Sequence, residues 1–215
     1  MKHVFITGGT GYMGKRLIPL LQEKGYTITA LVRKGSENKP PNCEIVIANP
    51  FEAASFMKDI PADATFVQLL GVPHPGPKKK EQFKTIDLAS VKASAIAALH
   101  AGVKHFVYVS VAQTPTSIMQ DYQQCRAEGE TIIRATTINA TFIRPWYVIG
   151  PGHYWPLLFQ PIFKILEWIP STSAKAKALR VVYLKQMLNA LVYAVEHAPA
   201  NGIDIIEVSD IRKMN

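Results

Sequence analysis

Short apolar runs alternate along the chain with longer segments in which apolar residues recur at helical spacing. The runs predict strands at Val4–Ile6, Thr27–Val32, Glu44–Ala48, Thr65–Leu70, Lys104–Ser110, Ala140–Ile143 and Ile203–Val208. Helices are expected around Leu17–Leu21, at about Glu52–Lys58, at Ile86–Ala101, at Met119–Arg134, at 161–168 between prolines, and at about 184–197. Strands that alternate with helices predict an α/β fold, with a doubly wound parallel sheet between two helical layers.

Glycines follow the first predicted strand directly, at positions 8, 9, 11 and 14. A tight turn here needs the backbone angles that glycine tolerates, and a pyrophosphate needs an approach without a Cβ atom. The helix behind the turn directs its free N–H groups and its positive dipole end toward the phosphates. This context predicts a dinucleotide site rather than an ordinary glycine-rich turn. The expected cofactor-binding residues of the turn are Thr7, Gly8, Thr10, Gly11, Tyr12, Met13 and Gly14.

The residue after the second predicted strand bears on the choice of cofactor. NAD-preferring sites commonly place Asp or Glu there, where it accepts hydrogen bonds from the ribose 2′-hydroxyl. This chain has Arg33 followed by Lys34, so no acid repels a 2′-phosphate and a guanidinium is available to bind it. We therefore expect NADP(H) as the preferred cofactor and NAD(H) as the other choice. The alternative is that Arg33 is only a surface residue that ends a strand.

Composition excludes several other classes of protein. The chain has 215 residues, enough for one well-buried domain, and no linker divides it. Its net charge is +8, but its only basic run, Lys78–Lys80, lies among prolines and predicts a solvated loop rather than a nucleic-acid partner. We expect no signal peptide and no integral membrane segment. Cys43 and Cys125 lack metal-ligand spacing, so we expect no metal site, and two free thiols suit a cytoplasmic protein.

The glycine turn resembles the TGxxGxxG turn of the atypical and extended short-chain dehydrogenase/reductase families. Nearly the whole chain is similar to these families, and most of all to their compact NAD(P)H-binding, NmrA-like and sugar-nucleotide-epimerase-like members. The resemblance implies a Rossmann fold in which Gly8, Gly11 and Gly14 form the phosphate turn and Gly71 lies beside the cofactor. The other segments that carry it, in the same order, are Leu31–Arg33, Ala101–Ser110, Tyr122 with Glu130, and Phe142–Pro151.

The resemblance also implies catalytic residues. In these families a tyrosine exchanges a proton with the substrate, a lysine four residues later lowers the tyrosine pKa, and a serine binds the reacting oxygen. Ser110 matches the serine and Tyr122 matches the tyrosine, but Arg126 stands in place of the lysine. Spacing of four residues puts Tyr122 and Arg126 on one helical face, so Arg126 is expected to supply positive charge near the phenol. The alternatives are a tyrosine that packs at the helix surface and a small serine that ends a buried strand.

Three further polar residues follow predicted strands, where ligands bind in open α/β sheets. Asn49 occupies a place where relatives often carry an acid that contacts adenine, and it otherwise forms a turn before Pro50. His74 follows the fourth strand near the expected nicotinamide, although most loop histidines are only solvated. Arg144 is grouped with the cofactor-side residues. Its guanidinium either binds an anion or pairs with an acid of the sheet-end loop.

The region after Gly150 is short for a substrate domain. Only about 65 residues follow Gly150, so we expect a single NAD(P)-binding domain over 1–215 with a reduced substrate region at about 151–215. The aromatic segment 153–168 is open to three interpretations: core packing, the wall of an apolar substrate pocket, or an exposed patch for membrane contact or self-association, such as a homodimer.

Two functions of different classes remain at this point. The first is an NADP(H)-dependent oxidoreductase, or a related epimerase, that transfers hydride to or from a small carbonyl or hydroxyl substrate. The second is a dinucleotide-binding redox sensor, regulator or assembly subunit without turnover. The glycine turn and Arg33 serve both equally. Ser110 and Tyr122 favour the enzyme, whereas the missing lysine favours the second function.

Overall fold

In the computed structural model, residues 2–36, 39–116, 118–154 and 177–215 are described, and they form a sheet of seven parallel strands. The strands are β1 (His3–Thr7), β2 (Thr27–Val32), β3 (Glu44–Ile47), β4 (Thr65–Gln68), β5 (His105–Val109), β6 (Asn139–Arg144) and β9 (Ile203–Glu207). Their order is β3-β2-β1-β4-β5-β6-β9, so the direction of winding reverses between β1 and β4. This is the Rossmann order, and the predicted doubly wound sheet is confirmed.

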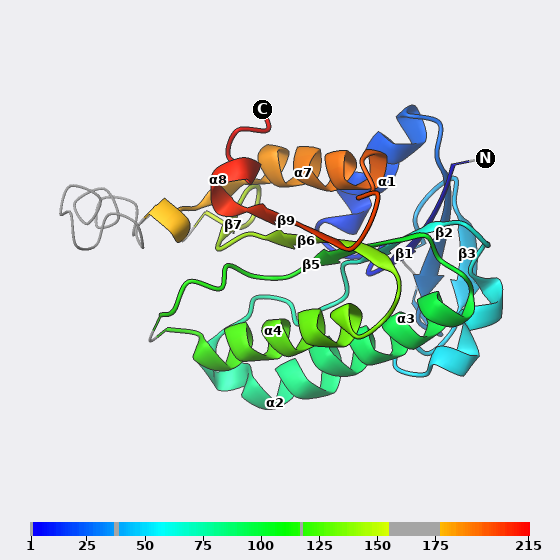
Figure 1. The fold of residues 1–215 in the computed structure, drawn as a ribbon, viewed down its shortest axis with the longest axis horizontal. Coiled ribbons are helices and arrows are strands. Elements are labelled where there is room, and N and C mark those ends of the chain that lie inside the picture. Colours follow the sequence, from blue (N-terminus) through cyan, green and yellow to red (C-terminus); the bar gives the residue numbers. More distant parts are fainter. Residues whose placement is uncertain (1, 37–38, 117, 155–176) are drawn as a thin grey trace.

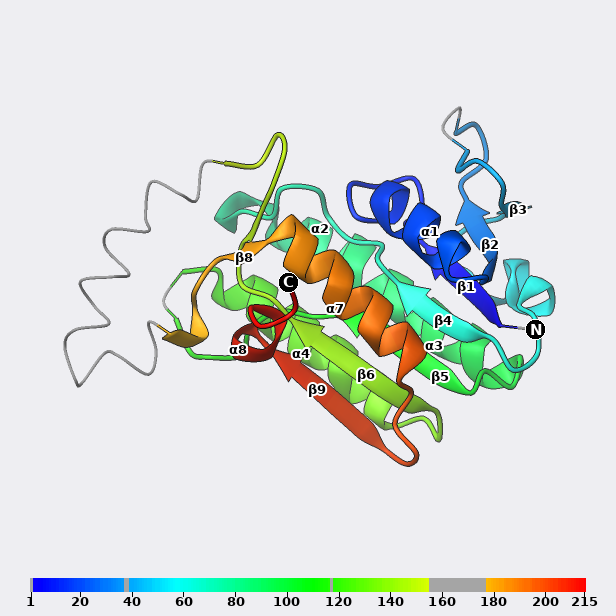
Figure 2. The ribbon, with the colours of Figure 1, turned by 90° about the horizontal axis from the view of Figure 1, so that it is seen from above.

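Helices cover both faces of the sheet and complete three layers (Figure 1). One layer holds α1 (Gly14–Glu23) and α7 (Leu184–Glu196), with the short α8 (Val208–Ile211) beside the first turns of α7. The other layer holds α2 (Lys80–Gln82), α3 (Ala89–His100) and α4 (Gln120–Arg134). Seen from above in Figure 2, α7 crosses the sheet beside α1, while α3 and α4 lie beneath the strands. Two very short strands, β7 (Val148–Ile149) and β8 (Val182–Tyr183), pair with each other near the start of α7.

The core follows from the alternation of side chains along the strands. In β1, Val4 and Ile6 pack in the cluster with α1 and α7, whereas Phe5 packs in the cluster with α3. Phe5 continues into a row of phenylalanine rings across neighbouring strands, 5.2 Å from Phe66, whose ring is in turn 4.9 Å from Phe106. Helix α3 contributes small buried alanines to the same cluster, so large rings on the sheet are matched by small side chains on the helix.

Two local predictions were wrong. The segment expected as a helix at Glu52–Lys58 forms two 3₁₀ turns, η1 (Ala53–Ser55) and η2 (Met57–Asp59). Between them Phe56 has φ −142° and ψ −7°, outside helical geometry, and Pro61 disfavours helical angles at Ile60.

The second concerns the helix predicted to begin at Ile86, which is the continuation of a helical segment that begins at Pro77. The 3₁₀ turn η3 (Pro77–Lys79), α2 and the π-helical segment η4 (Phe83–Leu88) precede α3 without a break. Pro77 occupies the first helical position, where a missing N–H group costs nothing. Lys78–Lys80 therefore lies on helical turns, not in the predicted loop, and Lys80 pairs with Asp121 at 2.7 Å.

The helices in the described part of the chain are all too short or too polar to cross a membrane. Cys43 and Cys125 are both free thiols. The helix predicted at 161–168 lies outside the described residues, as does all of the aromatic segment 153–168 except its first two residues.

Candidate functional site

The glycine turn after β1 leaves no space for side chains. Gly8 has φ +73°, and a Cβ atom there would lie 2.8 Å from the backbone nitrogen of Leu70, just beyond β4. A Cβ atom on Gly14, the first residue of α1, would lie 2.5 Å from the carbonyl oxygen of Gly8. The turn therefore rests on the end of β4, and α1 starts directly against the turn. This is the close strand–helix packing that a dinucleotide turn requires.

The start of α1 has the properties of an anion site. The N–H groups of Tyr12 and Met13 donate to no partner within the described residues, and the first turn of α1 carries no acidic side chain. Unpaired N–H groups at a helix start, together with the helix dipole, favour phosphate. Thr10 and Gly11 lie on the accessible side of the turn, whereas the Thr7 hydroxyl is buried and donates to Gln68 of β4. The backbone thus fits a dinucleotide pyrophosphate.

Arg33 and Lys34, which follow β2, are both exposed. Neither side chain has a hydrogen bond or an ion pair with any described residue, so both charges are available to a ligand. Asn49 follows β3, and its side-chain oxygen accepts the N–H of Phe51 at 3.1 Å. The side-chain oxygen of Asn49 thus stabilises a turn, as one alternative predicted, while its amide nitrogen stays available to a ligand. Cofactor contacts of these three residues stay predictions.

Arg126 is the centre of a buried charge cluster between α4 and η4. Its Nη2 lies 2.6 Å from Asp87 Oδ1, and the Asp87 side chain is completely buried. The other oxygen of Asp87 accepts the N–H of Val72 at 3.0 Å, in the loop after β4. A Cβ atom on Gly71 would collide with the Arg126 guanidinium. The loop predicted to lie beside the cofactor is therefore built directly on the Asp87–Arg126 ion pair.

Tyr122 lies on the same face of α4, one turn before Arg126. The Arg126 Cζ is 5.2 Å from the centre of the Tyr122 ring, and the ring of Phe83 is 5.0 Å away on another side. Burial raises the pKa of Tyr122 above its ordinary value, and the Arg126 charge offsets only part of this rise. The resemblance implied a lowered pKa instead. The phenol of Tyr122 is therefore protonated at neutral pH, and its raised pKa makes it a weaker acid than an exposed tyrosine.

Ser110 and Arg144 belong to a second buried network. Ser110 Oγ donates to Glu130 Oε1 at 2.7 Å, and Arg144 donates to both Glu130 oxygens, at 2.8 and 2.5 Å. Arg144 also reaches Glu207 at 2.8 Å, at the end of β9. The hydrogen bonds to Glu130 raise the pKa of Arg144 further. Both side chains thus have partners inside the protein. For Arg144 this agrees with the alternative in which it pairs with an acid. The roles of both residues toward a ligand stay predictions.

Three aromatic rings meet on the outer side of the glycine turn. The ring of Tyr12 contacts His153 at 4.4 Å between centroids, edge to face, and His153 stacks on His74 at 4.5 Å. His74 belongs to the loop after β4 and His153 to the loop after β7. A Cβ atom on Gly150 would collide with Tyr12 Oη, so the second loop is seated against the turn itself.

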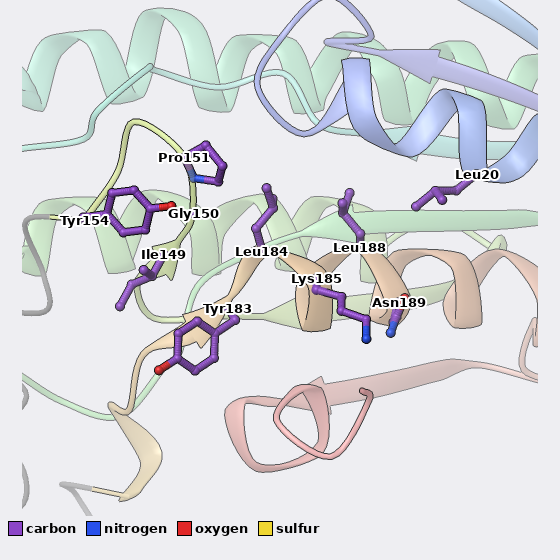
Figure 3. A pocket seen from close by; sticks show the side chains of 10 residues that line it. All are labelled: Leu20, Ile149, Gly150, Pro151, Tyr154, Tyr183, Leu184, Lys185, Leu188 and Asn189. Atoms are coloured by element: carbon purple, nitrogen blue, oxygen red, sulfur yellow. The ribbon is translucent and has the colours of Figure 1, made fainter.

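A pocket of about 510 Å³ lies between the first turns of α7, α1 and the loop after β7 (Figure 3). Leu184 and Leu188 of α7 line its middle, Leu20 of α1 lies at one end and Tyr154 and Tyr183 lie toward the other, and Lys185 and Asn189 lie along one side. None of the residues that line it is Ser110, Tyr122 or Arg126. This pocket is separate from the predicted catalytic residues.

Sequence reasoning did not identify Asp87 or Glu207 as site residues, and it included His153 only as the first residue of the aromatic segment 153–168. Asp87 is an acid on the buried side of a predicted helix, and a buried acid requires a cationic partner. Because Arg126 stands where the resemblance implies a lysine, the need of Asp87 for a cation could have predicted the Asp87–Arg126 ion pair. For Glu207 we find no comparable signal, because its partner Arg144 is distant in sequence.

Comparison with known proteins agrees with this geometry. Residues 8–150 match a family model described as NAD(P)H-binding. The chain is 24% identical over 213 residues to a ceramide reductase of Caulobacter vibrioides, covering 98% of this chain and 65% of that protein, so it spans somewhat less than two thirds of that relative. It is 28% identical over 155 residues to an uncharacterized sugar epimerase of Bacillus subtilis, covering 66% of this chain and 70% of the epimerase.

A solved structure shares the fold across nearly the whole chain. The Bordetella bronchiseptica enzyme WbmH, solved in complex with NAD⁺, superimposes with a TM-score of 0.68 at 18% identity, covering 99% of this chain and 80% of WbmH.

Proposed function

The chain belongs to the NAD(P)H-binding family, and from this premise we propose that it is an NADP(H)-dependent reductase in which Tyr122 donates the proton. Two of its relatives are named a reductase and a sugar epimerase, which supports an activity of the oxidoreductase or epimerase type. The proposed substrate is a small carbonyl compound. When bound, NADPH supplies the hydride to the carbonyl carbon, and the Tyr122 hydroxyl gives its proton to the carbonyl oxygen, so that an alcohol forms.

The position of the Arg126 guanidinium carries this proposal. It lies against the Gly71 backbone and 5.2 Å from the Tyr122 ring, so a cation stands between the cofactor-side loop and the phenol. The proposal therefore assigns to Arg126, paired with Asp87, the role that the resemblance gives to a lysine. Proton donation also requires a protonated phenol, which Tyr122 is at neutral pH, although burial raises its pKa and so makes it a weaker acid than an exposed tyrosine.

The proposed preference for NADPH rests on the residues after β2. Arg33 and Lys34 are exposed cations without partners among the described residues, and no acid stands at the strand end. A guanidinium binds a 2′-phosphate through charge-assisted, bidentate hydrogen bonds. The amide nitrogen of Asn49 is available to the adenine on the same side. WbmH was solved with NAD⁺, which makes NADH the necessary comparison in every binding experiment.

A second candidate is a dinucleotide-binding sensor or subunit without turnover. It is favoured by the partners of two predicted catalytic groups: Ser110 donates its hydroxyl to Glu130, and Arg126 pairs with Asp87. Both groups then serve stability rather than chemistry. Under this candidate the chain binds the cofactor and the bound state is read by another protein.

Steady-state NADPH oxidation with a panel of carbonyl compounds, run beside a binding titration, separates the two candidates. We expect turnover, and we expect Tyr122→Phe to lower kcat by about 100-fold or more, because general acid catalysis contributes 10²- to 10⁴-fold. NADPH affinity should stay the same, because the ring remains. Tyr193→Phe, on the exposed surface of α7, is the matched control.

Tight NADPH binding without turnover of any carbonyl compound would establish the second candidate. Turnover that is undiminished in Tyr122→Phe would instead keep the enzyme and remove its proposed proton donor.

A further inference from the structure

We propose that His153, with His74 stacked on it, forms an outer wall of the dinucleotide site, seated on Tyr12 of the glycine turn, and binds the pyrophosphate there. The inference rests on the proposed cofactor binding and adds to it two residues that neither the turn nor the catalytic set includes. It concerns affinity for the phosphates, not the chemistry at the nicotinamide.

The placement of His153 depends on contacts with the turn itself. Its ring meets the Tyr12 ring at 4.4 Å with an angle of 61° between the planes. Gly150, three residues earlier, lies so close to Tyr12 Oη that a Cβ atom would collide with it. Tyr12 belongs to the segment whose unpaired N–H groups are expected to bind phosphate. A side chain seated on Tyr12 therefore stands next to the pyrophosphate position.

Two buried polar atoms at this contact have no partner. His153 Nδ1 and Tyr12 Oη are both shielded from solvent, and neither makes a hydrogen bond to any described residue. A buried polar atom without a partner costs free energy, so two such atoms on a pair of contacting rings require an explanation. Both can donate to an anion, since an imidazole nitrogen and a phenol each carry a hydrogen when the tautomer allows it. A phosphate oxygen would satisfy them.

The surroundings favour an anion over a neutral ligand. Arg16 lies over the Tyr12 ring, with Cζ 4.3 Å from its centre, and donates to the Tyr12 carbonyl oxygen at 2.8 Å. The free N–H groups of Tyr12 and Met13 add donors, and the first turn of α1 has no acid. One guanidinium and two free N–H groups thus belong to the same turn as the Tyr12 hydroxyl. This set matches a diphosphate better than a ribose or a nicotinamide ring.

His74 holds His153 in this place. The two rings stack at 4.5 Å with 16° between their planes, and His74 has φ +50°, in the left-handed region that few non-glycine residues adopt. Strained backbone of this kind is kept where surrounding structure requires it. The stack links the loop after β4 to the loop after β7 across the turn, which gives the site two walls.

The test compares variants that keep the ring with variants that keep the hydrogen-bonding atom. His153→Phe preserves the stack but removes both nitrogens, and His153→Asn places an amide near the position of Nδ1. NADPH, NADH, 2′-phospho-ADP-ribose and adenosine 2′-monophosphate are titrated into each full-length variant by calorimetry or by competition. We expect His153→Phe to bind NADPH and 2′-phospho-ADP-ribose about tenfold more weakly, the effect of one charge-assisted hydrogen bond. His153→Asn should recover part of that loss.

Adenosine 2′-monophosphate contains no pyrophosphate, so its affinity should be the same for His153→Phe and the unaltered chain. The matched control is His197→Phe, because His197 also stacks on a tyrosine, Tyr193, at 4.2 Å, at the far end of α7. Its NADPH affinity should not change.

Each contrary outcome has a separate meaning. If the unaltered chain binds dinucleotides and His153→Phe binds them equally well, the outer wall is refuted while the proposed function stands. Equal losses for all four ligands would also refute it, because the change would then not concern the pyrophosphate. If the unaltered chain binds neither NADPH nor NADH, the proposed function fails and this inference fails with it.

Discussion

At the residue scale, Arg126 uses the shape of its guanidinium, which a lysine at this position does not have. Its Nη1 donates to the Val109 carbonyl at the end of β5 at 2.9 Å, while Nη2 pairs with Asp87. An ammonium group offers its donors from one compact atom and does not span both partners in the same way. Removal of either member of a buried ion pair costs about 3–5 kcal/mol, so we expect Asp87 and Arg126 to be needed together.

The cofactor preference is a single-residue prediction. Arg33→Ala should weaken NADPH binding by about tenfold or more, because a charge-assisted hydrogen bond contributes about 1.5–3 kcal/mol. NADH binding should change little, since NADH has no 2′-phosphate. Both affinities are measured by fluorescence titration. Lys58→Ala, an exposed residue of η2, controls for the loss of one positive charge. A variant that keeps the same ratio of the two affinities would exclude Arg33 from cofactor selection.

His105 makes stability depend on pH. Burial lowers its pKa from 6.5 to about 4, and its ring lies within hydrogen-bond distance of Thr141 Oγ1, at 2.9 Å. Between pH 6.5 and 4 the unfolded chain takes up this proton and the folded chain does not, so stability falls as the pH is lowered. The full effect is roughly 3 kcal/mol, at about 1.4 kcal/mol for each pKa unit.

Urea unfolding at several pH values measures this dependence. His105→Gln should flatten the slope between pH 6.5 and 4, and the exposed His100→Gln should leave it as it is. An unchanged slope in His105→Gln would mean that another group carries the effect.

At the element scale, α4 is held against the sheet by close contacts rather than by a wide apolar face. A Cβ atom on Gly129 would lie 2.6 Å from Tyr108 Oη on β5, and Gln123 donates to the carbonyl oxygens of Ala112 and Thr114, at 2.6 and 2.9 Å. The glycine thus sets how near the helix lies to β5. Because Arg126 is on the same helix, that distance also positions the charge beside Gly71.

Gly129→Ala tests this spacing. Alanine favours a helix over glycine by about 1 kcal/mol, whereas overpacking a buried contact costs about 1–3 kcal/mol. The contact is with a completely buried ring, so we expect a net loss of stability in urea or thermal unfolding. Tyr108→Phe removes the atom that collides, so the double variant should lose less than the sum of the two single changes. Strict additivity, or a stabilised Gly129→Ala, would contradict the proposed role of the glycine.

At the scale of the whole molecule, the sequence predicted the sheet well because a buried strand carries its own local pattern. Residues such as those of β5 and β6 read as apolar runs, and the observed strands begin and end within two residues of the prediction. The helical segment before Ile86 was missed because a π-helical turn has neither of the spacings used to recognise helices and strands.

The site was predictable only in part. Residues that act through backbone shape, such as Gly8 and Gly14, are visible in a local pattern. The links from Arg126 to Asp87 and from Arg144 to Glu207 join segments far apart in sequence, and no local periodicity reports such pairs. They arise from the strand order, which brings together the carboxyl ends of neighbouring strands and the helical segments that follow the strands.

Gly8 packs against the backbone of Leu69–Leu70, so the glycine turn depends on a segment that is synthesised after it. Strand β1 is synthesised first, yet it lies inside the sheet between β2 and β4. A nascent chain that ends before residue 65 therefore carries the glycine turn without the backbone on which it rests. Ribosome-bound fragments should acquire native structure at this turn only once β4 has left the exit tunnel, because a parallel pairing cannot form before its second strand exists.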